Sequence, residues 1–92
     1  MKKPICINIY RKGISFFSTI IFEKGIKYTK EYSKEKLFYM KKEIEMIVGK
    51  NQIKDFLKDY ENIVIARDDI SPTIIYIIII DMLVSFERWL VQ

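Results

Sequence analysis

The first third of the chain alternates hydrophobic and polar positions with the two-residue period of β-strands. Between residues 5 and 10, three isoleucines alternate with Cys, Asn and Tyr, a pattern typical of a strand with one buried face. Residues 14–23 carry hydrophobic side chains on both faces, which indicates a central strand, and residues 26–32 form a more polar third strand. Gly13 and Gly25 close the two connections, where glycine supplies the positive φ of a bulged hairpin turn. These segments predict a three-stranded antiparallel meander.

Helical spacing follows the meander, because hydrophobic residues now recur at steps of three and four. Ser33 is a suitable N-cap and Gly49 a suitable terminator, so we expect a first helix over about residues 34–48. A second helical stretch begins near Asn51. Residues 62–66 are short, apolar and β-branched, as in a strand buried on both faces. We expect this strand to lie parallel to the first strand and beside it.

The last segment, residues 72–90, combines a good helix start with strand-forming side chains. Ser71 and Pro72 favour a helix, whereas the isoleucines of residues 74–80 favour a strand, which stays open as the alternative. We prefer the helix because an apolar stripe at helical spacing continues to the end of the chain. The opposite face of this predicted helix carries three more apolar residues: Ile77, Ile80 and Val84. A helix with two apolar faces must be covered on both, so we expect these residues to form a homodimer interface.

The predicted fold class is α/β, in one domain over residues 1–92: an antiparallel meander, a helix, one parallel strand and a C-terminal helix. This order resembles a shortened ribonuclease H-like fold. Nucleases of that family hold two magnesium ions with acids on the first strand, the first helix and the end of the fourth strand. The resemblance places the following residues at those positions: Asn8, Glu43 or Glu45, and Asp68 or Asp69. Because an asparagine on the first strand is a neutral and weaker magnesium ligand, we expect no metal and no catalytic residue.

Composition excludes several other chemistries. The chain has no histidine, which removes imidazole bases and mixed Cys/His zinc sites, and one cysteine, which removes an intrachain disulfide. A reducing, cytoplasmic compartment fits this cysteine usage. The uncharged run over residues 70–80 is shorter than the ~20 residues needed to span a bilayer, so no membrane association is expected. We expect no enzymatic activity and no cofactor.

Charge is distributed unevenly along the chain. Positions 1–42 carry eleven Lys or Arg against three acids, and positions 43–92 carry five against nine, which gives +8 and −4. Lysines and tyrosines are interleaved on the third strand and at the start of the first helix. We expect these residues to contact a partner: Lys24, Lys27, Tyr28, Lys30, Tyr32, Lys34 and Lys36. The alternative is that they form a solvated edge that prevents unwanted strand pairing.

These observations favour a small binding protein over an enzyme. We expect a non-catalytic stoichiometric regulator or inhibitor, of phage or mobile-element type, that docks on a host protein complex handling nucleic acid. Two alternatives stay open. The chain could bind nucleic acid nonspecifically through its basic strand edge, with lysines on phosphates and tyrosines stacking on bases. It could also be a small metal-dependent nuclease of ribonuclease H-like fold.

Overall fold

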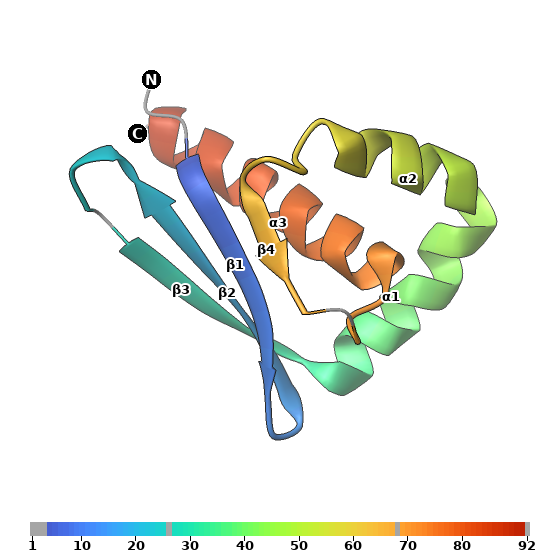
Figure 1. Ribbon diagram of the computed structural model, residues 1–92. Coiled ribbons are helices and arrows are strands. Elements are labelled where there is room, and N and C mark those ends of the chain that lie inside the picture. The colour runs from blue at the N-terminus through green and yellow to red at the C-terminus, as the bar shows by residue number, and fades with distance from the viewer. Residues whose placement is uncertain (1–3, 26, 68, 92) are drawn as a thin grey trace.

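The protein folds into a sheet that carries its helices on one face (Figure 1). The computed structural model describes residues 4–25, 27–67 and 69–91, with the backbone alone for Lys24 and residues 86–91. The elements are β1 (Pro4–Lys12), β2 (Ser15–Phe22), the 3-10 turn η1 (Glu23–Gly25), β3 (Lys27–Ser33), α1 (Lys34–Ile47), α2 (Lys50–Lys58), β4 (Val64–Ala66) and α3 (Pro72–Val91). The predicted fold class and the predicted order of elements are confirmed.

The sheet has the strand order β3-β2-β1-β4. β1 pairs antiparallel with β2, β2 pairs antiparallel with β3, and β4 runs parallel to β1, as expected. The prediction that the fourth strand is buried on both faces is wrong. β4 lies at an edge of the sheet, and Ile65 in its middle is 61% exposed. Its side chain lies on the face that the helices leave uncovered.

The two faces of the sheet differ because side chains alternate along each strand. The residues that face the helices are buried: Ile7, Ile9, Phe16, Ile20 and Phe22. On the opposite face, the rings of Tyr10 and Phe17 stack with centroids 5.4 Å apart, and Thr19 is hydrogen-bonded to Thr29 at 3.1 Å. The hydrophobic core therefore lies between the sheet and the helices.

α3 is the central element of this core. Its residues Ile78 and Ile79 are fully buried, and α3 contacts both α1 and α2 (Figure 1). The helix assignment over residues 74–80 is thus confirmed in place of the strand. Within the described chain, none of the helices combines the length and hydropathy required of a bilayer-spanning segment.

The three residues assigned to the second apolar face of α3 differ in their burial. Ile77 is only 4% exposed and belongs to the core of the same chain, which contradicts its assignment to an interface. Ile80 is partly buried, and Val84 is 51% exposed. Ile77 instead packs within the core of its own chain, in which α1 and α2 both contact α3.

The α1–α2 connection determines where the lysines of these two helices lie. The start of α1 is fixed by Ser33, whose side chain accepts a hydrogen bond from the backbone nitrogen of Lys36 at 3.2 Å.

The end of α1 and the start of α2 are separated at Gly49, which adopts φ 76° and ψ 149°, a conformation essentially restricted to glycine. The chain changes direction there, and α2 runs from the end of α1 toward the loop that enters β4 (Figure 1).

Candidate functional site

The predicted basic surface does not form one continuous face. Side chains alternate along β3, so Lys27 lies opposite Ile21 on the uncovered face of the sheet. Lys30 lies opposite Ser18, which is buried against the helices. Lys27 and Lys30 therefore point to different sides of the sheet and do not present their charges to one ligand.

Lys30 and Tyr32 bind an acid of the protein itself. The Lys30 ammonium group and the Tyr32 hydroxyl each donate a 2.6 Å hydrogen bond to Oδ2 of Asp81 on α3. Tyr32 is only 8% exposed, which corrects its assignment as a surface anchor for a partner. Burial and the bond to the Asp81 carboxylate raise the pKa of Tyr32 far above its usual value. Burial opposes ionisation of Asp81, but the hydrogen bonds from Lys30 and Tyr32 outweigh it and lower the pKa of this carboxyl.

The other predicted contact residues are spread over β3 and α1, and the charge of Lys36 helps to lower the pKa of Asp81. Tyr28 is 43% exposed, and its ring meets Phe22 edge-on with centroids 5.8 Å apart. Lys36 is exposed on the first turn of α1. The side chain of Lys24 lies outside the described residues. Lys34 is the one predicted residue that adjoins the concave surface described next.

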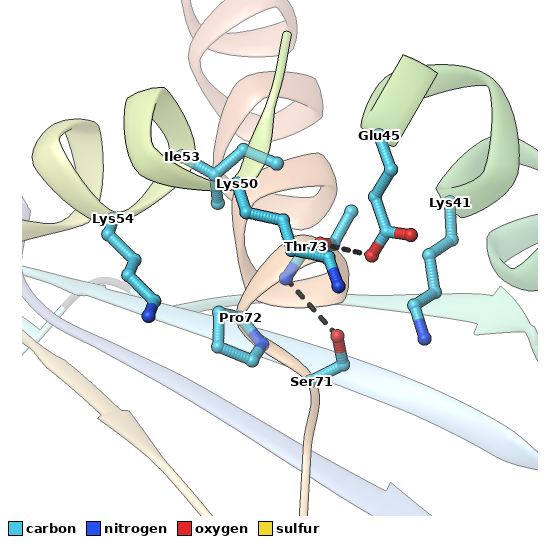
Figure 2. A pocket seen from close by; sticks show the side chains of 8 residues that line it. All are labelled: Lys41, Glu45, Lys50, Ile53, Lys54, Ser71, Pro72 and Thr73. Carbon is cyan, nitrogen blue, oxygen red and sulfur yellow. Dashed lines mark hydrogen bonds between the residues drawn. The ribbon is translucent and has the colours of Figure 1, made fainter.

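Two hollows adjoin along α1 and together form what we call the basic groove. The first, of ≈ 300 Å³, is lined by Phe38, Lys41, Lys42 and Glu45. The second, of ≈ 210 Å³, is lined by Lys41, Glu45, Lys50, Lys54, Ser71 and Thr73, with Ile53 and Pro72 (Figure 2). The hollows share Lys41 and Glu45 and therefore adjoin, the first on α1 and the second between α1, α2 and the start of α3.

Lysines outnumber the carboxylate among the lining residues of the groove. Figure 2 shows the ammonium groups of Lys41 and Lys54 on either side of the turn into α3, with that of Lys50 between them. Glu45 is the single acid in both linings, and its Oε1 accepts a 2.8 Å hydrogen bond from the hydroxyl of Thr73. Thr73 is 4% exposed, so this hydrogen bond holds the Glu45 carboxylate against the buried first turn of α3. The groove is therefore a positively charged surface that can hold an anion.

The Phe38 ring lines the part of the groove that lies on α1. The Lys34 ammonium group lies over the Phe38 ring, 5.3 Å from its centroid, and Phe38 is 41% exposed. Behind it, the Phe16 ring lies 6.4 Å from Phe38, and the Arg11 guanidinium lies 5.6 Å from the centroid of Phe16. Phe38 thus presents an exposed ring beside a cation, an arrangement suited to ligands that combine negative charge with flat groups.

The sequence held a partial signal for this groove. Lys34 and Lys41 are seven residues apart on α1, and Lys50 and Lys54 are four apart on α2, so each pair shares one side of its helix. The sequence does not predict that lysines of the two helices meet, because the placement of α2 relative to α1 depends on the turn at Gly49. The apolar stripes of these helices predict their buried faces and do not indicate where their lysines meet.

The residues that the ribonuclease H-like resemblance assigned to a metal site do not converge. Asn8 lies on the uncovered face of the sheet, opposite Ile65 and Thr19, whereas Glu43 and Glu45 lie on α1 across the sheet. Asp69 is exposed and forms a 3.5 Å ion pair with Arg67, and Asp68 lies outside the described residues. Among the residues that the structure describes, no three acids or thiols are grouped closely enough to hold a metal ion.

Comparison with known proteins adds no functional assignment. No family model, no curated protein and no solved structure matches the chain.

Proposed function

We propose that the protein is a non-catalytic binding protein that docks on a nucleic-acid-handling complex through the basic groove. The observation that carries this proposal is the convergence of Lys41, Lys50 and Lys54 on one hollow whose single carboxylate is already bonded to Thr73. A ligand that enters this hollow meets ammonium groups from two helices. The partner surface is accordingly acidic or phosphate-bearing.

The concave shape of the groove strengthens its attraction for anions. Cations that line a cleft with low-dielectric walls focus the field and raise the local concentration of an oppositely charged ligand. Because lysines at this surface remain in contact with water, their main contribution is to accelerate association. Salt screens such charges over ~8 Å at physiological ionic strength, so binding through the groove should weaken as salt rises.

The residues of the groove are suited to stoichiometric binding. They supply ammonium donors, hydroxyl groups and an exposed ring, which hold a ligand without a reaction step. This set supports a regulator or inhibitor that acts by occupying a surface of its partner.

Heparin affinity chromatography tests whether the groove, rather than overall charge, binds polyanions. The groove variant is Lys41→Gln with Lys54→Gln. The control variant is Lys12→Gln with Lys27→Gln, two exposed lysines outside the groove that remove the same two charges from a net +4. We expect the groove variant to elute at clearly lower salt than the control variant. Equal elution of the two variants would show that net charge alone governs retention and would refute the proposal.

A further inference from the structure

We infer that the ligand of the basic groove is single-stranded nucleic acid, with one base stacked on Phe38 and the neighbouring phosphates bound by Lys41, Lys50 and Lys54. This inference rests on the proposed function, because it names the partner of the same groove. It differs from the expectation for the β3 edge, since it places the contact on α1, α2 and the turn into α3.

Phe38 provides a platform for a base. Its ring lines the first hollow, is 41% exposed and has the Lys34 ammonium group 5.3 Å from its centroid. Proteins that bind single strands combine such rings with nearby cations, so that a base stacks while the adjoining phosphate is neutralised. Phe16, 6.4 Å away and 2% exposed, supports the ring from the core side.

The second hollow provides the phosphate sites. Lys41 lines both hollows, so a strand whose base lies on Phe38 reaches Lys41 first and then Lys50 and Lys54. The Ser71 oxygen accepts a 3.3 Å hydrogen bond from the Thr73 backbone nitrogen, which leaves the Ser71 hydroxyl proton available to a phosphate oxygen. The order along the groove is thus a ring followed by cations, which matches the order of a base and the backbone that follows it.

Several features favour a single strand over a duplex. The bases of a duplex are stacked on one another, and their faces are closed to a protein ring, whereas an unpaired base can leave its neighbours. The groove is concave, so it cannot insert a helix into a DNA major groove in the way of the common duplex readers. Arginine, the main reader of base edges, does not line either hollow. Binding should therefore show little sequence preference.

Fluorescence anisotropy with a labelled oligothymidylate of about 16 nucleotides tests this inference. We expect the wild type to bind, with an affinity that falls as salt rises. Lys41→Gln with Lys54→Gln should weaken binding and reduce the slope of log affinity against log salt by about 1.4, because each lost phosphate contact removes about 0.7. Phe38→Leu should weaken binding at least about fivefold without changing this slope, since stacking does not depend on counterions. Melting curves confirm that each variant is folded.

Matched controls separate the groove from the β3 edge. Tyr28→Leu removes an exposed ring of β3, and Lys12→Gln with Lys27→Gln removes two charges outside the groove. We expect both controls to bind the oligonucleotide more tightly than the corresponding groove variants. If Tyr28→Leu weakens binding and Phe38→Leu does not, the inference is wrong.

The remaining outcomes distinguish this inference from the proposed function. Equal or tighter binding of a duplex of the same length would overturn the assignment to single strands. If polyglutamate binds in a groove-dependent manner and the oligonucleotide does not, the ligand is an acidic protein segment; the inference then fails while the proposed function stands. If neither the oligonucleotide nor heparin distinguishes the groove variant from its control, both are refuted.

Discussion

The hydroxyl of Tyr32 donates a 2.6 Å hydrogen bond to the carboxylate of Asp81, 49 residues further along the chain. This bond joins the edge strand β3 to the central helix α3, and the Lys30 ammonium group binds the same carboxylate oxygen. β3 is an edge strand of the sheet, and it also contacts α1, which follows it directly in the chain. These two hydrogen bonds therefore stabilise the packing of β3 against α3.

Replacing Tyr32 with phenylalanine should lower the free energy of unfolding by about 1–2 kcal/mol at neutral pH, because a hydrogen bond to a charged group is lost. In the wild type the raised pKa of Tyr32 means that the folded state retains a proton which the unfolded state releases above about pH 10. The contribution of the Tyr32–Asp81 hydrogen bond to the free energy of unfolding is therefore present below about pH 10 and is lost as pH rises above it. Urea titrations from neutral to alkaline pH should show the difference between wild type and Tyr32→Phe shrinking above about pH 10. A constant difference would contradict the role given to this bond.

Replacing Asp81 with asparagine should destabilise the fold by about 1–2 kcal/mol at neutral pH, a modest cost because the Lys30 pair is partly exposed to water. The lowered pKa of Asp81 means that its contribution is present above the ordinary aspartate value, about 3.9, and is lost as pH falls below it. Unfolding measured between neutral pH and about pH 3 should therefore show a steeper acid loss for the wild type than for Asp81→Asn. Parallel acid profiles would show that Asp81 is not stabilised as a carboxylate.

Replacing Ile77 with alanine should cost about 2–5 kcal/mol of unfolding free energy, because the side chain is buried in the core of a single chain. The melting temperature should fall by the same amount at every protein concentration. Val84→Ala is the control on the same helix, since Val84 is 51% exposed and its truncation should cost far less. A melting temperature that rises with concentration in the wild type and not in Ile77→Ala would restore the homodimer interface.

Replacing Gly49 with alanine should destabilise the fold by about 1–3 kcal/mol, because its φ of 76° and ψ of 149° are strained for any residue with a Cβ. Nothing lies within 4 Å of the added methyl group, so the cost is conformational rather than steric. Asn51→Ala is a control in the first turn of α2, where the side chain is exposed. Chemical denaturation measures both. Equal stability of the two variants would show that the turn between α1 and α2 does not depend on glycine.

Local patterns in the sequence predict most of the elements because they act over a few residues. Ser33 caps α1, as expected from its place before a helical stripe, and the alternation around Ile7 and Ile9 predicts β1 and its buried face. β4 does lie parallel to β1, but the burial on both faces from which this placement was inferred is absent at Ile65.

The wrong predictions concern surfaces, which depend on how elements pack. Tyr32 was taken as exposed because β3 is polar, but it belongs to the half of β3 that faces the helices. Ile77 was assigned to an interface because the sequence does not show that α1 and α2 both pack against α3. The groove was missed for the same reason, since Lys41 and Lys54 meet only after the chain turns at Gly49.

An NMR titration of the ¹⁵N-labelled protein with the same oligothymidylate tests the location of the binding surface most directly. If the basic groove is the binding surface, amide shifts should concentrate at residues 38–45, 50–54 and 71–73, and β3 should change little. Shifts confined to β3 or to the uncovered face around Tyr10 and Phe17, or no shifts at saturating oligonucleotide, would contradict the assignment of single-stranded nucleic acid to the groove.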